Sequence, residues 1–209
     1  MAKSDKYYQN LYELAATLNS ARSPDDILRS IVENVARAMN AKGCSLMLLT
    51  PDKKVLLHTA AHGLSDWFVR KGPVSADKSM SESLKGDSVA VLDAATDDRV
   101  EYQKQVKQEG IVSILSVPVK LRDEIVGVMR VYTAEARRFT DADISFATAA
   151  ANFGAIALES AHFYETIQTD YDKLRQDIRR RRAEIGYEAI AEPSVVPPEE
   201  PGPVAPAGG

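Results

Sequence analysis

The hydrophobic pattern of the chain changes its period twice, and this limits the folds that the chain can adopt. Apolar residues recur three and four apart within 8–18 and again within 27–39, which predicts two amphipathic helices. The second helix has Ser23 as its N-cap and Pro24 in its first turn. A third helical pattern begins near Thr140 and runs to the end of the charged part of the chain.

Short apolar runs lie between these helical patterns. The runs 44–50 and 55–62 are joined by a Pro-Asp turn, and the runs 114–121 and 125–133 by Arg-Asp-Glu, so each pair predicts a β-hairpin. Successive apolar residues within a run indicate a sheet that is covered on both faces. Between the hairpins we expect two short helices, a brief strand at 88–92, and a helix that begins at Asp97 or Asp98 and ends at Glu109. The pattern predicts an α+β fold with long N- and C-terminal helices.

The last helix carries a heptad pattern that its own domain cannot bury. Apolar residues alternate spacings of four and three from Phe153 to Ile185, weakened at Ser160 and Arg181. Such a seam predicts pairing with a second copy of the chain, with help from the N-terminal helix. The predicted dimer interface comprises Leu11, Phe153, Tyr164, Ile167, Tyr171, Leu174 and Ile178.

Composition excludes several classes of function. Six of the ten prolines follow Ala191, so 191–209 is expected to be a disordered Pro-rich tail. The formal net charge of -4 argues against nucleic acid as a partner. One cysteine, Cys44, permits neither an internal disulfide nor a multi-cysteine metal site. The sequence shows no signal peptide and no run long enough to span a membrane, which indicates a cytoplasmic protein.

Four phrases of the sequence resemble a known family. They are AAHGLSDWF, SMSESLKGDSVAVLDAATDDRVEY, EGIVSILSVPVKLRDEIVGVMRVYT and ARRFTDADISFATAAANFGAIALESA. Together they make residues 27–163 similar to a GAF domain. The resemblance implies a PAS-related antiparallel sheet that is covered by helices and binds a small molecule. It also implies dimerisation through the flanking helices, which pass a signal to a partner.

The chain departs from the best-known chemistries of that family. Its cyclic-nucleotide binders carry an Asn-Lys pair and a Phe followed by Asp-Glu, but this chain has Thr133-Ala134 and, after Phe139 and Asp143, Ile144. This disfavours a cyclic nucleotide. The cysteine that attaches a bilin is absent from the pocket region, and the several cysteines of the methionine sulfoxide reductases are absent too.

The irregular region between Trp67 and Arg99 supplies most of the candidate ligand contacts, because pockets combine apolar walls with a few polar groups. Asp93 follows a strand and Arg99 lies in the predicted first turn of a helix. The resemblance places both near the family's pocket, although Asp93 could instead cap a turn and Arg99 could pair with an acid. The candidate ligand-binding residues are Trp67, Met80, Ser81, Asp93, Arg99, Tyr102 and Ser116.

Other polar residues have plainer interpretations. His58 and His62 share a face if their strand is regular, roughly 13 Å apart at about 3.3 Å per residue, too far to chelate one ion. Cys44 is expected to be a small buried hydrophobe. The run RQDIRRRR is flanked by acids and fits a solvated coiled-coil face better than a nucleic-acid site. We predict no metal and no cofactor.

These observations favour a non-catalytic small-molecule sensor that acts as a homodimer on a downstream signalling protein. The expected parts are an N-terminal dimerisation helix at 1–22, a GAF domain at 23–163, a coiled-coil extension at 164–190 and the tail at 191–209. One alternative is a dimerisation or adaptor module with a vestigial pocket. An enzyme on a GAF scaffold ranks third, because no catalytic constellation is recognised.

Overall fold

The computed structural model describes residues 3–20, 23–77 and 81–184. The chain divides into two compact units, Met1–Glu165 and Thr166–Gly209. The first unit holds every strand and all helices but the distal part of the last one. In the second unit the described residues, 166–184, are helical. No helix within the described ranges is long and apolar enough to cross a membrane.

Six antiparallel strands form one sheet, as expected from the two hairpins, with the order β3-β2-β1-β6-β5-β4. The outer hairpin pairs β1 with β2, and the inner hairpin pairs β5 with β6. The strands are β1 (Gly43–Leu49), β2 (Val55–His62), β3 (Val74–Ser75), β4 (Val89–Val91), β5 (Ser113–Leu121) and β6 (Glu124–Thr133).

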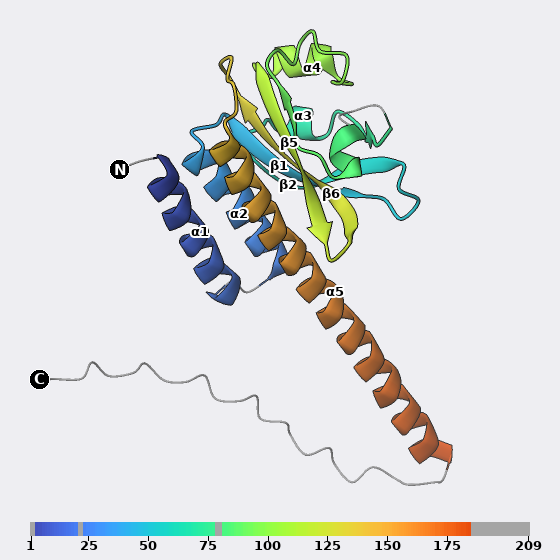
Figure 1. The fold of residues 1–209 in the computed structure, drawn as a ribbon. Coiled ribbons are helices and arrows are strands. Elements are labelled where there is room, and N and C mark those ends of the chain that lie inside the picture. The colour runs from blue at the N-terminus through green and yellow to red at the C-terminus, as the bar shows by residue number, and fades with distance from the viewer. Residues whose placement is uncertain (1–2, 21–22, 78–80, 185–209) are drawn as a thin grey trace, which may run out of the picture. The chain divides into compact units, whose positions relative to one another are not determined.

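Helices cover both faces of this sheet (Figure 1). One face packs against the helices at the two ends of the first unit, and the other lies under short helices and loops. The first group is α2 (Pro24–Ala38) and α5 (Asp141–Glu184), and α1 (Lys3–Ser20) packs against these two helices. The second group is α3 (Asp66–Val69), the 3-10 helix η1 (Ser81–Lys85) and α4 (Gln103–Gln108). The structure therefore confirms the predicted α+β layout.

The main core lies between the sheet and the terminal helices. The Ser23 hydroxyl caps α2 by accepting a hydrogen bond from the Asp26 N–H at 3.2 Å. Each strand contributes alternate residues to this core because successive side chains point to opposite faces. Its fully buried members include Leu28, Ile31, Leu46, Leu115, Val117, Met129, Val131 and Phe146.

A buried carboxylate joins α1 to the start of α5. Asp143 is fully buried and accepts hydrogen bonds from the Tyr7 hydroxyl at 2.5 Å and from Arg137 at 2.7 Å. The Thr140 N–H and hydroxyl bind its other oxygen at 2.9 and 2.8 Å. The ring of Tyr7 stacks on Phe146, with 4.3 Å between the centroids. Asp143, the residue that this chain shares with the cyclic-nucleotide pattern, therefore caps and anchors helices here.

The predicted helix from Asp97 or Asp98 to Glu109 was wrong in its first half. The helix α4 begins only at Gln103. Before it, Asp93 and Asp97 each accept a hydrogen bond from the backbone N–H two residues ahead, both at 3.0 Å. These side chains hold the backbone in turns, which compete with helix formation.

A β-bulge in β2 overturns the expected arrangement of its histidines. Leu46 pairs with Ala60 but Met47 pairs with His58, so one residue of β2 is left over between them. The bulge moves His62, which pairs with Cys44, to the face that α2 covers, and leaves His58 on the opposite face. The two histidines therefore do not share a face.

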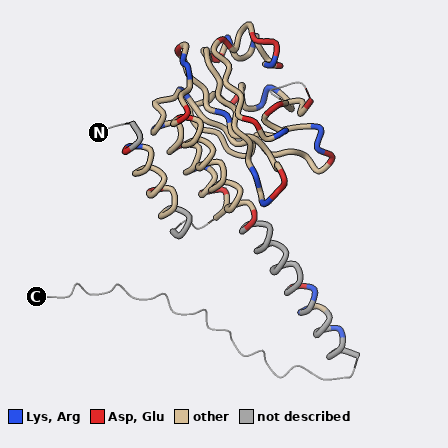
Figure 2. Tube along the Cα trace, in the orientation of Figure 1, with Lys and Arg blue, Asp and Glu red and all other residues tan. Residues whose placement is uncertain are grey.

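Figure 2 shows Lys and Arg interspersed with Asp and Glu around the sheet and its turns. Several of these charges pair, such as Lys53 with Glu124 at 3.9 Å and Arg122 with Glu159 at 2.5 Å. Both pairs are largely exposed and therefore contribute little to stability.

Candidate functional site

A row of polar side chains crosses the sheet on the face turned away from α2 and α5, which we call the ligand face. Arg130 of β6 lies directly opposite Ser45 of β1 and Ser116 of β5. Residues that pair directly across antiparallel strands point to the same side. The two serines are fully buried and Arg130 is 6% exposed. Buried hydroxyls and a buried guanidinium are costly in a core, so their presence in one row makes it a candidate functional site.

Tyr132 extends this row along β6. Its hydroxyl lies 3.0 Å from the Ser45 hydroxyl and also forms a hydrogen bond with Arg130. Burial raises the pKa of Tyr132, and burial lowers the pKa of Arg130. The ring of Phe68 packs edge-on against the Tyr132 ring, with 6.1 Å between centroids. The guanidinium is thus held from one side by a rigid aromatic residue.

His58 and Lys71 add a second cation and an imidazole to the ligand face. The Lys71 ammonium lies 3.3 Å from His58 Nε2, donates to the Phe68 carbonyl at 3.0 Å, and sits 3.9 Å from the centre of the Phe68 ring. Burial, and next the charge of Arg130, lower the pKa of Lys71 to about 8. Burial, and then the charges of Lys71 and Arg130, lower the pKa of His58 to about 3. His58 is therefore neutral at pH 7.

The ammonium of Lys71 fixes the tautomer of His58. A lysine ammonium can only donate, so Nε2 accepts and the proton of the neutral ring resides on Nδ1. Within the described parts of the chain, the buried His58 Nδ1 and the Ser116 hydroxyl have no hydrogen-bond partner. Buried polar atoms in native proteins are normally satisfied, so each of these two is a candidate for contact with a ligand. We call Ser45, His58, Lys71, Ser116, Arg130 and Tyr132 the polar cluster.

Short segments between β2 and α4 form the cover of the ligand face. The Tyr102 hydroxyl donates to the Pro73 carbonyl at 2.7 Å, and its ring centre lies 5.6 Å from the Lys71 ammonium. The Ser83 hydroxyl of η1 contacts the Ser116 carbonyl at 3.4 Å. Apolar side chains complete the contact between cover and sheet: Met47, Leu49, Leu56, Val74, Leu84 and Val128.

Two carboxylates act on Lys71 from the rim of the site. Both Glu109 and Glu101 raise its pKa, against the larger effect of burial. Each is already bound elsewhere: Glu101 accepts from the Ser75 N–H at 2.8 Å, and Glu109 accepts from the Ser65 N–H at 2.9 Å and from its hydroxyl. These carboxylates hold the cover segments in place through hydrogen bonds, and the centre of the cluster contains the cations.

The structure places two of the predicted ligand residues at this site. Ser116 lies in the row beside Arg130, and Tyr102 belongs to the cover. Ser81, at the start of η1, lines a separate cavity of about 470 Å³ together with Leu84 and Lys85. Met80 falls outside the described residues.

The other predicted ligand residues make local contacts. Trp67 is 41% exposed and packs edge-on against Phe68, which is the buried member of α3. Asp93 is exposed and caps a turn, while Arg99 binds Asp97 at 2.9 and 2.6 Å. The predicted Asp93–Arg99 combination is therefore not found, and both residues follow the plainer interpretation that the sequence also allowed.

Five residues of the polar cluster were not predicted from the sequence: Ser45, His58, Lys71, Arg130 and Tyr132. For Arg130 a signal was present, because it is the only charged residue within the apolar run 125–133. A charged residue within an apolar, buried strand is costly and therefore suggests a function. The same reasoning had identified Ser116 as the polar member of its strand. The face of the sheet on which His58 lies could not be predicted, because it depends on a β-bulge that no residue of the strand indicates.

The described residues contain no group of three or more His, Cys, Asp or Glu side chains that could hold a metal ion. Cys44 lies on the opposite face of the sheet from Arg130, fully buried, and burial raises its pKa. A thiol in such surroundings is protonated and unreactive.

Comparisons with known proteins agree with the fold. No curated protein sequence matches the chain. Solved structures that resemble it include the GAF domain of a phosphoenolpyruvate-protein phosphotransferase from Coxiella burnetii, at 17% identity and a TM-score of 0.70, over 78% of this chain and 98% of that one. The corresponding Acinetobacter domain is 25% identical, with a TM-score of 0.62, over 76% and 93% of the two chains.

A third similar structure is an enzyme. The free methionine-R-sulfoxide reductase of Neisseria meningitidis is 13% identical, with a TM-score of 0.65, and the match covers 78% of this chain and 95% of that one. At this identity the likeness concerns the fold alone. The family model of the GAF domain matches residues 21–159, and the chain thus belongs to the GAF domain family, whose members are sensory and ligand-binding domains of signalling proteins.

Proposed function

We propose that this protein is a cytoplasmic, dimeric, non-catalytic sensor that binds a small molecule on the ligand face and transmits its presence through the terminal helices. The observation that carries the proposal is the polar cluster, where the buried His58 Nδ1 and Ser116 hydroxyl have no hydrogen-bond partner among the described residues. A ligand that supplies those partners would stabilise the folded protein.

The sheet offers a direct connection from the ligand to the helices. Arg130 faces the ligand, and its neighbours Met129 and Val131 on the same strand face α2 and α5. A ligand that favours one position of β6 would therefore change the packing under the terminal helices. Signalling by this route requires a ligand with different affinities for two arrangements of the sheet and helices.

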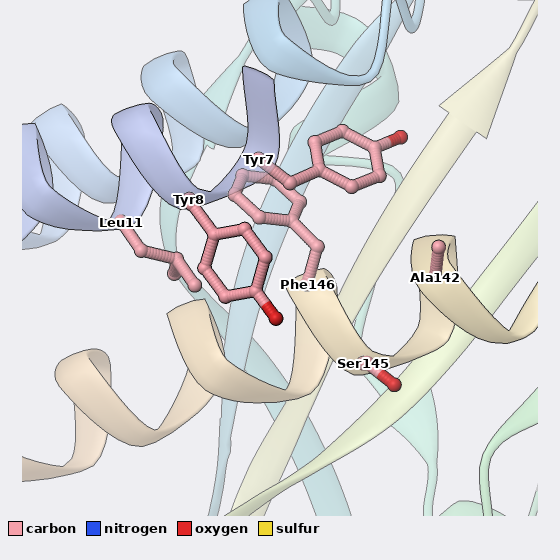
Figure 3. Close-up of a pocket in the computed structure, with 6 residues that line it drawn as sticks. All are labelled: Tyr7, Tyr8, Leu11, Ala142, Ser145 and Phe146. Atoms are coloured by element: carbon pink, nitrogen blue, oxygen red, sulfur yellow. The ribbon is translucent and has the colours of Figure 1, made fainter. Parts of the chain in front are cut away.

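Dimerisation through α1 and α5 is the second part of the proposal. Tyr8 and Tyr12 of α1 are 74% and 78% exposed, and Ile156 of α5 is 50% exposed. Aromatic residues in such positions are typical of protein interfaces. Beside them, α1 and α5 enclose a groove of about 130 Å³ lined by Tyr7, Tyr8, Leu11, Ala142, Ser145 and Phe146 (Figure 3).

Of the predicted interface residues, only two lie where side chains are described. Leu11 and Phe153 are partly buried and pack against the core of their own chain. The side chains of Tyr164, Ile167, Tyr171, Leu174 and Ile178 lie outside the described residues. In our proposal 1–22 and 164–190 pair with a second copy, 23–163 binds the ligand, and the tail 191–209 is available to a downstream signalling protein.

The non-catalytic part of the proposal rests on Cys44. The similar methionine sulfoxide reductase shows that this fold can carry catalysis. In this chain the single cysteine lies on the face away from the polar cluster and is fully buried. No thiol is therefore available to a ligand on the ligand face.

An adaptor with a vestigial pocket is the rival, and one observation favours it. Phe68, Leu84 and Tyr102 already pack onto the ligand face and take up part of its surface. The rival predicts that no small molecule binds there. Ligand binding therefore separates the two proposals.

A thermal-shift screen of small metabolites against the full chain tests the sensor. We expect a binder whose affinity falls at least tenfold in Ser116→Leu, because the larger side chain occupies the ligand face beside Arg130. Thr59→Leu on the exposed surface of β2 is the control and should keep the affinity. A binder that is unaffected by Ser116→Leu would place the site elsewhere, and the absence of any binder would favour the adaptor.

Dimerisation is tested by adding charge to α1. We expect Tyr12→Glu to weaken the dimer at least tenfold in sedimentation equilibrium, because a carboxylate at the interface loses its solvation. Trp67→Glu is the control, since Trp67 is a 41% exposed aromatic residue of α3, which covers the opposite face of the sheet. Equal dimerisation of both variants would exclude α1 from the interface.

A further inference from the structure

We infer that the ligand is a small organic anion, and that Arg130 and Lys71 bind its carboxylate or phosphate group. This inference rests on the proposed function, and it assigns the chemical class of the ligand. It follows from the kinds of hydrogen-bonding group that the ligand face presents.

The groups that point to the ligand face are mainly donors. Arg130 and Lys71 carry only donors, and His58 presents the N–H of Nδ1 because its Nε2 accepts from Lys71. Ser116 adds a hydroxyl that can also donate. Two cationic side chains that can only donate are complementary to a group that only accepts, and carboxylates and phosphates are such groups. A neutral amide or alcohol would set its own donors against these N–H groups.

The charges of the polar cluster also indicate an anionic ligand. Arg130 is 6% exposed, and its charge and that of Lys71 both act on His58. Two like charges in a buried site repel each other, and an anion between them removes that repulsion. The carboxylates of the rim offset this repulsion in part, since Glu109 and Glu101 both raise the pKa of Lys71, but burial and the charge of Arg130 outweigh them there.

The surroundings of the cations indicate that the rest of the ligand is apolar. The Lys71 ammonium lies over the Phe68 ring at 3.9 Å and near the Tyr102 ring at 5.6 Å. Met47 and Val128, which flank the cluster on β1 and β6, are fully buried or nearly so. A small aliphatic or aromatic acid fits these walls with its charged end at Arg130.

Matched probes test the charge requirement directly. Acetate and acetamide have nearly the same shape and differ in charge, and inorganic phosphate distinguishes a phosphate preference from a carboxylate preference. Titrated into the isotope-labelled full chain, acetate or phosphate should shift the NMR signals of the ligand face, including the His58 ring nitrogens. Acetamide should bind at least tenfold more weakly than acetate.

Charge-removing variants locate the binding group. Arg130→Met and Lys71→Met should each weaken anion binding at least tenfold, while Lys104→Met, which removes an exposed lysine of α4, should leave it unchanged. If Arg130→Met fails to fold, Lys71→Met and the pH dependence of the wild-type chain still show whether the anion binds at this site. Affinity should fall as the pH rises through about 8, because Lys71 then loses its charge, and Lys71→Met should remove this dependence. The charged and titratable groups that face Lys71 are Arg130, Glu101, Glu109, His58 and Tyr102.

The outcomes separate this inference from the proposed function. Wild-type anion affinity in both Met variants would overturn the placement of the anion, as would equal affinities for acetate and acetamide. A neutral metabolite that binds the ligand face while anions do not would overturn the inference and leave the sensor intact. A chain that binds neither class would overturn both.

Discussion

Replacing Asp143 by alanine is expected to lower the free energy of unfolding by about 3–5 kcal/mol, the usual cost of removing one partner from a buried ion pair. The carboxylate is fully buried and receives hydrogen bonds from Tyr7, Arg137 and Thr140. Its loss leaves Arg137 without its counter-ion, uncaps α5 and releases the contact that anchors α1. Urea unfolding followed by circular dichroism measures the change.

Asp141→Ala is the matched control. Asp141 lies in the same first turn of α5 but is exposed, so only its interaction with the helix dipole is lost, about 0.3–1 kcal/mol. If both variants lose the same small amount, the buried network does not hold the terminal helices. Tyr7→Phe should lose about 1.5–3 kcal/mol, because it removes one hydrogen bond to a charged group and keeps the ring stacked on Phe146.

Gly63→Ala is expected to destabilise the protein by about 2–5 kcal/mol, from backbone strain and from a clash. Gly63 follows β2 with φ +72°, and a Cβ there would lie 2.2 Å from the Lys42 carbonyl oxygen and 3.0 Å from the Gly43 Cα. Both contacts are with backbone, which cannot move aside as a flexible side chain would.

Gly110 provides a control with the same backbone conformation. Its φ is +73°, and a Cβ at this position would meet nothing within 4 Å. Gly110→Ala should therefore cost only the left-handed strain, about 1–2 kcal/mol. The difference between the two variants in thermal or urea unfolding measures the close approach of the chain at Gly63. Equal losses would show that strain alone accounts for both.

Much of the fold could be predicted from sequence because its signals are local. The turn at Arg122, which has φ +55°, separates β5 from β6 as the sequence predicted. The Ser23 cap likewise marks the start of α2. The start of α4 was missed because the Asp93 and Asp97 side chains hold turns in a segment with helical spacing.

The candidate site was harder to predict because it forms across strands. Ser116 was found as the polar member of an apolar run, and Arg130 gave the same signal but was not interpreted. Which residue of α3 turns inward, Trp67 or Phe68, cannot be read from a helix of four residues, since it has no period to compare. The side of the sheet on which His58 lies depends on the bulge, and its partner Lys71 comes from a loop.

Native mass spectrometry of the gently purified full-length protein tests the central claim most directly. We predict a dimer that carries the additional mass of a small acid, and that loses this mass in Lys71→Met and Arg130→Met while Lys104→Met retains it. The adduct would also identify the ligand. A monomer without added mass, which stays unchanged when metabolites are supplied, would contradict both the dimer and the sensor.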